Sequence, residues 1–355
     1  MNSKAKIGNQ IQCSAVPRMF SRLRWLPEHS AADLFVAGSW ADYVNSVSLF
    51  KCSRDPSCED GMQIVPELIA EIPFYGDVTG LEILDEGVGD TTQPQQLACS
   101  TSEGYIHLLG VEREMDRDNL QPLHQYETRH KFGESNAACT GLSVYGARLL
   151  ATAGEDGLLH IIDKSRDLVR SYDEGNECSF RCVEFTSSTD VLASSSIGGI
   201  KSYDIRASPN KPSFELVTDI AEEKENVVAT CISHYPNKPQ FVFAGLSNGM
   251  IKVWDLRMKN HWPISMKGHS STVNDIAFAK HDASIMFSAS EDGEILQWSV
   301  NNSVLTSEPD LARIVRQQPP LLNERRAINS LDTNRTQLLA GGDCHMVYLV
   351  DTISK

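Results

Sequence analysis

Three residues of the kinds that form a nucleophilic triad lie in the last third of the chain. His269, Ser288 and Asp292 have the chemistry in which a histidine takes the proton of a serine nucleophile. Ser288, however, stands in the middle of a strand-like run beside a donor, Trp298, rather than on an exposed turn. We therefore interpret His269, Ser288, Asp292 and Trp298 as a structural tetrad, because buried polar groups need hydrogen-bond partners. We expect no catalytic residue and no enzyme activity.

Two other groups of reactive residues have simpler structural explanations. The pairs Glu155-Asp156 and Glu291-Asp292 could supply a general acid and a base, but adjacent positions on a tight turn point in different directions. Cys178 and Cys182, with His160 nearby in the chain, are zinc-binding residue types. No second cysteine pair accompanies them, and Cys182 falls on an expected inner strand. We expect no metal and no cofactor.

The composition is that of an acidic globular chain of 355 residues. It has 32 Lys and Arg against 47 Asp and Glu, a formal net charge of −15. Binding nucleic-acid phosphates takes clustered cations, and the longest basic tract is Arg325-Arg326. No apolar run approaches the roughly 20 residues that span a bilayer, and the N-terminus lacks a signal-peptide core. We therefore expect no direct nucleic-acid binding, no membrane insertion, and reduced cysteines in the cytosol or nucleus.

A sequence motif that occurs seven times predicts the β-strands that must position these residues. Each copy has a run of small and β-branched residues, a tight turn and a second apolar run. The turn is Asp-Gly or Asn-Gly at Asp156-Gly157, Asn248-Gly249 and Asp292-Gly293, as in β-hairpins. A spacing of roughly 40–60 residues is the period of propeller blades with variable loops. The copies span residues 34–50, 96–111, 148–163, 190–206, 240–257, 284–300 and 337–351.

The repeats predict an all-β, seven-bladed propeller. Stacking the blades in a ring buries the apolar faces that a single blade would expose. Blade six is expected at 272–280, 284–291, 293–300 and 312–318. Blade seven has only three strands before the chain ends, whereas a spare β-capable stretch lies at 6–15. We expect this stretch to supply the missing outer strand and to remove the free edge at the join. A single domain is predicted over 1–355, with the closing strand and lead-in at 1–18 and the blades at 19–355.

Blade six resembles the WD40 repeat. Gly268-His269, Ser288, Asp292 and Trp298 match the pattern in which histidine, serine, aspartate and tryptophan of one blade are hydrogen-bonded. We expect other blades to keep only fragments of the set, such as Asp156 in blade three and Trp254-Asp255 in blade five.

Blade five suggests an alternative function. Trp254-Asp255-Leu256-Arg257 resembles the WDxR box of substrate receptors for cullin-based ubiquitin ligases. The resemblance implies that Arg257 would reach an adaptor protein, with Trp254 and Asp255 beside it. Asn248 stands where that box prefers an acid.

Several stretches resemble the nucleoporin 43 family of WD40 proteins. They match over nearly the whole chain at corresponding spacing, although Phe50 stands where the family suggests tryptophan. The matching stretches are Leu23-Arg24-Trp25-Leu26-Pro27, Ala37-Gly38-Ser39-Trp40, Ser46-Val47-Ser48-Leu49-Phe50, Cys139-Thr140-Gly141, Gly154-Glu155-Asp156-Gly157, Ser196-Ile197-Gly198, Ser290-Glu291-Asp292-Gly293 and Gly341-Gly342-Asp343.

The resemblance implies a scaffold subunit of the Y-shaped complex in the outer ring of the nuclear pore. The expected partners are other nucleoporins, chiefly an α-solenoid nucleoporin of the short arm of the Y, around a monomeric propeller. The expected location is the nuclear envelope at nuclear pores, with a role in pore assembly and in mRNA and protein transport. Family members are also associated with kinetochores in mitosis.

The blade-one turn with Trp40, Asp42 and Tyr43 is the candidate partner-binding site, because exposed aromatic residues commonly anchor interfaces. The alternative is that Trp40 packs into the top of its own blade.

Overall fold

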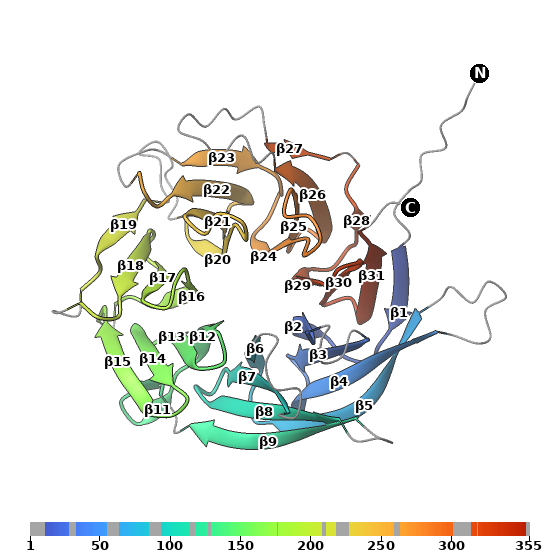
Figure 1. Ribbon diagram of the computed structural model, residues 1–355, viewed down its shortest axis with the longest axis horizontal. Coiled ribbons are helices and arrows are strands. Elements are labelled where there is room, and N and C mark those ends of the chain that lie inside the picture. Colours follow the sequence, from blue (N-terminus) through green and yellow to red (C-terminus); the bar gives the residue numbers. More distant parts are fainter. Residues whose placement is uncertain are drawn as a thin grey trace.

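Seven antiparallel sheets, each of at least four strands, stand around a central axis in the computed structural model (Figure 1). In six blades the strands follow chain order from the axis outward. The predicted all-β propeller with seven blades is therefore confirmed. The structure describes residues 11–27, 33–54, 64–84, 94–113, 118–126, 129–175, 177–207, 211–217, 227–258, 263–300, 314–317 and 319–352.

The first four blades follow one another along the chain. Blade one holds β2 (Phe20–Trp25), β3 (Leu34–Ser39), β4 (Asn45–Arg54) and β5 (Ile64–Phe74). Blade two holds β6 (Val78–Leu84), β7 (Gln95–Thr101), β8 (Ile106–Arg113) and β9 (Asp118–Tyr126). Blade three holds β12 (Cys139–Tyr145), β13 (Leu149–Gly154), β14 (Leu158–Asp163) and β15 (Asp167–Asp173). Blade four holds β16 (Phe180–Phe185), β17 (Asp190–Ser195), β18 (Ile200–Asp204) and β19 (Phe214–Leu216).

The last three blades complete the ring. Blade five holds β20 (Ala229–His234), β21 (Phe241–Leu246), β22 (Met250–Asp255) and β23 (Ile264–Lys267). Blade six holds β24 (Val273–Phe278), β25 (Ile285–Ser290), β26 (Glu294–Val300), β27 (Ile314–Arg316) and a short β28 (Leu322–Asn323) that also pairs with β26. Blade seven holds β29 (Ile328–Thr333), β30 (Gln337–Gly342) and β31 (Met346–Asp351).

The N-terminal segment closes the ring, as predicted. Strand β1 (Ile11–Ala15) pairs antiparallel with β31, with Ile11 opposite Val350 and Ala15 opposite Met346. It is the fourth, outermost strand of blade seven (Figure 1). Residues 6–10 of the predicted closing stretch lie outside the described residues. The first and last segments of the chain are thus joined by a strand ladder, which leaves no open sheet edge at the join.

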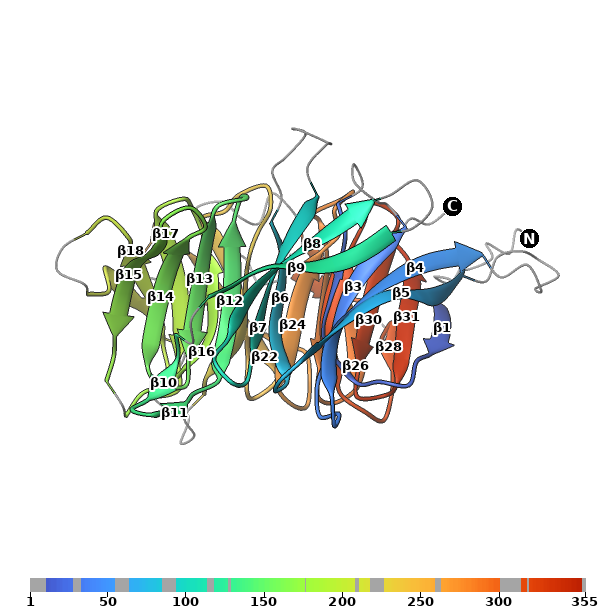
Figure 2. The same ribbon diagram turned by 90° about the horizontal axis from the view of Figure 1, so that it is seen from below.

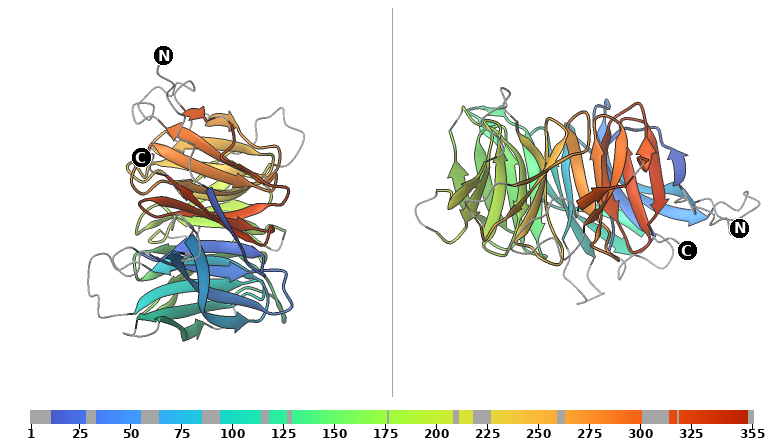
Figure 3. Two further views of the ribbon diagram at one scale, coloured as in Figure 1. Left: turned by 90° about the vertical axis from the view of Figure 1, so that its right-hand side faces the viewer. Right: turned by 90° about the horizontal axis from the view of Figure 1, so that it is seen from above.

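Antiparallel pairing distributes the connections between two opposite faces of the ring (Figures 2 and 3). We call the face at which each inner strand begins the entry face. It carries the turn between the second and third strands of each blade and the connection from one blade to the next. It also carries a hairpin that the sequence did not predict, β10 (Lys131–Phe132) and β11 (Ser135–Asn136), at the lower edge of Figure 2.

A β-bulge recurs at the second residue of the seven inner strands and fastens neighbouring blades together. The register slips at the same point in each of them. At five junctions the bulged side chain donates a hydrogen bond to the first carbonyl of the next inner strand. These bonds run from Ser21 to Val78, Thr140 to Phe180, Thr230 to Val273, Asn274 to Ile328 and Asn329 to Phe20. The last of these crosses the closing seam between blades seven and one.

The apolar core lies between the blades rather than inside any one of them. Between blades five and six, Phe278 meets Tyr235 and Phe243 edge to face, with ring centroids 5.3 and 5.1 Å apart. Strands β3 and β21 are buried on both faces, as expected for strands sandwiched between neighbouring sheets. Among the described residues, no helix is long and apolar enough to cross a membrane.

Candidate functional site

The structure brings the four residues of the blade-six tetrad together. His269, in the connection between β23 and β24, places Nδ1 3.2 Å from both carboxylate oxygens of Asp292 and Nε2 2.8 Å from Ser288 Oγ. Trp298 Nε1 donates to the same Ser288 oxygen at 2.9 Å. Burial lowers the pKa of His269 despite Asp292, so the neutral ring donates from Nδ1 and accepts at Nε2. Ser288 is completely buried, which leaves its hydroxyl no access to a substrate.

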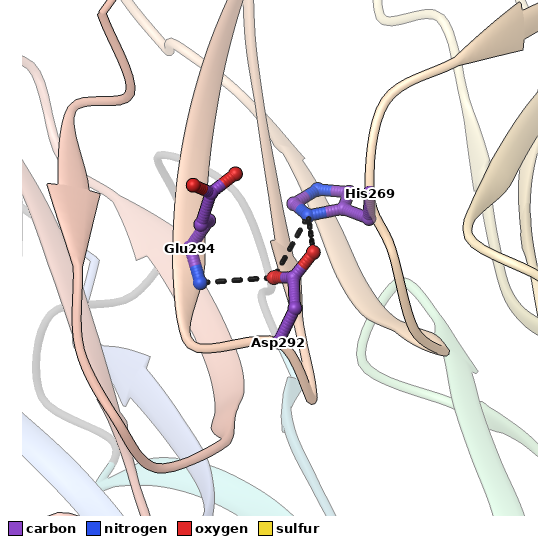
Figure 4. A group of neighbouring side chains, drawn as sticks. All are labelled: His269, Asp292 and Glu294. Carbon is purple, nitrogen blue, oxygen red and sulfur yellow. Dashed lines mark hydrogen bonds and ion pairs between the residues drawn. The ribbon is translucent and has the colours of Figure 1, made fainter.

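Glu294 lies beside the tetrad, and with His269 and Asp292 it forms a group of possible metal ligands. Ligand atoms of His269, Asp292 and Glu294 lie within 4.8 Å of one another (Figure 4). Donors already surround these oxygens: Asp292 accepts from the Glu294 backbone at 3.0 Å, and the Glu294 carboxylate accepts from Asn323 at 2.8 Å. Arg316 also lies 3.5 Å from the Glu294 carboxylate. The donor set therefore fits a hydrogen-bonded corner better than a cation site, where oxygens must face a metal.

Blade three holds a second network of the same design. His130 lies 2.9 Å from Asp156 Oδ1 and 3.1 Å from Thr152 Oγ1, and the Lys131 N–H donates to Asp156 Oδ2. Ile162 stands ten positions after Thr152, as Trp298 does after Ser288, so the tryptophan alone is missing. Blade three therefore keeps three of the four positions, of which sequence analysis identified Asp156 alone.

The histidine of blade three escaped sequence analysis because its spacing differs. His130 precedes Asp156 by 26 residues, whereas His269 precedes Asp292 by 23. The β10–β11 hairpin lies between His130 and β12 and lengthens the interval. A search for histidine that allows an inserted hairpin would have found the pair.

The two buried histidines of blade three titrate in opposite directions. Burial alone would lower the pKa of His130, but hydrogen bonds to Asp156 and Cys139 raise it to about 9. His160 packs against it with ring centroids 5.0 Å apart. Burial and the neighbouring His130 lower the pKa of His160 to about 4. The protein thus holds one charged and one neutral imidazole side by side.

The cysteines considered for zinc have separate partners. Cys178 Sγ lies 3.0 Å from Ser195 Oγ, while Cys182 Sγ lies 3.2 Å from Ser194 Oγ. His160 bonds instead to Ser171 and to the backbone. Burial raises the pKa of the Cys182 thiol to about 12, so it is a poor thiolate ligand.

In each of the pairs Glu155-Asp156 and Glu291-Asp292, the two carboxylates have different surroundings. Asp156 and Asp292 bond to the buried histidines, whereas Glu155 is exposed and Glu291 accepts a hydrogen bond from Ser271 at 2.9 Å.

The WDxR box lies at the end of β22. Trp254 is buried in the core shared by blades four and five. Arg257 forms a two-pronged ion pair with Asp255, with Nη2 2.6 Å from Oδ2, and lies over the ring of Phe241. Its side chain is 57% exposed. The local pair gives both charged residues a role within the blade.

The structure separates the three residues of the blade-one turn. Trp40 is half-buried, and its Nε1 donates to Asp343 Oδ1 of blade seven at 3.2 Å. It therefore bridges the closing seam between blades seven and one. Asp42 lies 3.8 Å from Arg18. Tyr43 alone of the three is fully exposed.

The central channel contains a partly buried charge cluster that sequence analysis missed. Arg24 of the inner strand β2 lies 2.7 Å from Glu82 and 3.8 Å from Asp275, and it donates to Ser330. Burial alone would lower the pKa of Arg24, but these two carboxylates raise it above its usual value. The alternation of Arg22 and Arg24 on an inner strand was the available signal, because both must face the axis. The pairing fixes the inner strands of blades one, two and six relative to one another.

The fold and the blade-six tetrad together indicate the class of protein to which the chain belongs. Residues 216–255 and 263–299 match the WD domain, G-beta repeat family model, over strands of blades four to six. The chain is a seven-bladed WD40 β-propeller.

Three similar proteins are nucleoporins, which makes the classification more specific. The chain is 25% identical to the human nucleoporin Nup43 over 312 residues. This alignment covers 83% of this chain and 77% of the human protein. It is 23% identical to mouse nucleoporin Nup43, over 87% of this chain and 80% of the mouse protein. It is also 23% identical to the Arabidopsis thaliana nuclear pore complex protein NUP43, over 88% of both chains. The resemblance to the nucleoporin 43 family is therefore confirmed over most of the chain.

Proposed function

We propose that this chain is a non-catalytic scaffold subunit of the nuclear pore complex, located at the nuclear envelope. The observation that carries the proposal is the match to nucleoporins from animals and a plant across 83 to 88% of the chain. Matches of this length align whole propellers rather than one shared repeat.

The buried networks support a structural role over a catalytic one. Ser288 has the partners of a triad serine, yet it is fully buried and its oxygen already accepts the indole N–H of Trp298. A nucleophile must reach a substrate within about 3 Å. The polar side chains here instead hold turns and blades in one geometry.

We infer a finer placement from the family resemblance. The chain would be a monomeric propeller in the Y-shaped complex of the outer ring, beside an α-solenoid nucleoporin of the short arm. There it would support pore assembly and the transport of protein and mRNA. A rigid ring closed by its own N-terminal strand suits a subunit that several neighbours contact at once. The same resemblance extends the proposal to kinetochores in mitosis.

Localisation combined with purification tests the proposal. A fluorescent tag on the chain should give a signal at the nuclear rim, and purification from the same cells should recover solenoid nucleoporins. A diffuse signal together with a purification that lacks nucleoporins would overturn the assignment. The kinetochore role is tested separately, by imaging the same tagged chain in mitotic cells.

A further inference from the structure

Exposed apolar side chains gather on one part of the entry face. Tyr43 is fully exposed on the β3–β4 turn, and Val44 beside it is 48% exposed. Tyr75, on the β5–β6 connection, is 78% exposed, and Phe132, on the β10–β11 hairpin, is 45% exposed. We call Tyr43, Val44, Tyr75 and Phe132 the aromatic arc.

The rest of the same face differs from the aromatic arc. In blades five, six and seven, the turns between the second and third strands carry Asn248, Asp292 and His345 at their tips. Among the described residues of these three turns there is no exposed large apolar side chain. In blade four, Ile197 in the corresponding turn is 62% exposed and Val217, just after β19, is 58% exposed. Exposed apolar tips therefore occur from blade one to blade four, and the aromatic ones lie from blade one to the entry of blade three.

The turns of the arc are held rigid. Asp77 Oδ1 accepts the Ala41 N–H at 2.8 Å and the Asn45 side-chain amide at 3.0 Å, which joins the turns that carry Tyr43 and Tyr75. Arg18 donates to the Val44 carbonyl at 3.1 Å from the lead-in to β2. Ala41 has a φ of 58°, a strained value for a residue with a side chain.

This rigidity has a physical consequence for binding. A fully exposed tyrosine on an otherwise bonded turn contributes nothing to the fold by its ring. Ordering it in advance, however, lowers the entropy cost of an interface. Because tyrosine is enriched among the residues that dominate binding energy, Tyr43 and Tyr75 have the properties of interface anchors.

The charges around the arc indicate what it binds. The turns at 40–44, 75–77, 102–105, 131–136 and 155–157 hold one lysine or arginine, Lys131. The carboxylates on them that reach solvent are those of Asp42, Asp77, Glu103, Glu134 and Glu155, of which Asp42 lies 3.8 Å from Arg18. An apolar surface with an acidic border complements an apolar contact flanked by lysine or arginine.

We propose that the aromatic arc is the docking surface for the α-solenoid nucleoporin, which contacts it through apolar side chains flanked by lysine or arginine. This rests on the proposed function, since the partner is the one named there. It replaces Trp40 with Tyr75 as the second anchor, because Trp40 is committed to the closing seam.

Binding of the two purified full-length proteins tests the proposal. The double variant Tyr43→Ala, Tyr75→Ala should raise the Kd by about tenfold or more. Tyr145→Ala is the matched control, because Tyr145 is 43% exposed at the opposite end of an inner strand, β12. It should change the Kd by less than about twofold. Thermal unfolding of both variants checks that the fold is intact.

Charge reversal supplies a second arm. Glu103→Lys with Glu134→Lys should slow association and weaken its dependence on salt, because both changes remove attraction for a basic partner. If the wild-type chain binds and the tyrosine variant binds equally well, the arc is not the docking surface, whereas the proposed function stands. If the wild-type chain does not bind the solenoid protein at all, the proposed partner fails, and the arc proposal fails with it.

Discussion

Equivalent histidines in two blades carry different charge because their surroundings differ. His269 faces Ser288 and Trp298, and burial lowers its pKa. In blade three, Ile162 stands at the sequence position that corresponds to the tryptophan, and the hydrogen bonds of His130 to Asp156 and Cys139 outweigh burial. The same position in a blade can thus favour a charged or a neutral histidine, depending on the groups that surround its ring.

The raised pKa of His130 predicts a pH-dependent contribution to stability. Unfolded histidine titrates near pH 6.5, whereas folded His130 titrates near pH 9. The contribution is therefore fully present below pH 6.5 and is lost as the pH rises toward 9, on the order of 3 kcal/mol in all. The difference in unfolding free energy between wild type and His130→Gln should shrink over this range, as measured by chemical denaturation at several pH values.

His269→Gln is the control for this measurement. The pKa of His269 is lowered, so both its folded and unfolded forms are neutral above about pH 6.5. The cost of His269→Gln should then stay constant from pH 7 to 9. A His130→Gln cost that is equally constant would show that His130 is not charged in the folded protein.

At the scale of elements, β1 stabilises the fold by closing the ring. It pairs with β31 over five residues, and Val16 continues the contact by donating to the His345 carbonyl. Removing it would expose the edge of β31 and break the hydrogen-bonded strand pairing that joins the two ends of the ring.

Deletion of residues 2–16 should therefore lower the melting temperature sharply, by about 5 °C or more. Deletion of residues 2–9 is the matched control, since it ends before β1 and should leave the melting temperature unchanged. Both variants can be compared by calorimetry. Equal melting curves for wild type and the longer deletion would mean that β1 does not hold the ring closed.

Much of each blade could be predicted because its strands are joined by local turns. Blade six, expected at 272–280, 284–291, 293–300 and 312–318, forms strands at Val273–Phe278, Ile285–Ser290, Glu294–Val300 and Ile314–Arg316. Its turn needs a glycine, and Gly293 has a φ of +82°. The short strands β10, β11 and β28 were not predicted, because pairs of two residues leave no periodic pattern.

At the scale of the whole molecule, the two candidate functions place different demands on Arg257. A ubiquitin-ligase receptor would use its exposed guanidinium to reach an adaptor. A pore scaffold needs only its ion pair with Asp255, which is local to blade five.

Arg257→Ala therefore separates the two functions. We expect the variant to keep its rim localisation and to bind the solenoid nucleoporin as the wild type does, since an exposed local ion pair contributes little. Tagged wild type and variant can be compared by imaging and by purification. Loss of a bound ligase adaptor in the variant, with the rim signal absent in both, would instead favour the receptor function.

The amino-acid sequence alone determined the seven repeats, their hairpins and the tetrad of blade six, because each of these depends on residues within about 30 positions of one another. It also indicated the closing strand, since one blade lacked a strand and the other end of the chain had one to spare. Only the tertiary structure decided which side chains meet across blades. Trp40 reaches Asp343, Arg24 reaches Glu82 and Asp275, and Asn329 reaches Phe20 through closure of the ring. Closure sets these contacts because it brings together residues that are distant in the chain, and no local pattern records such a distance.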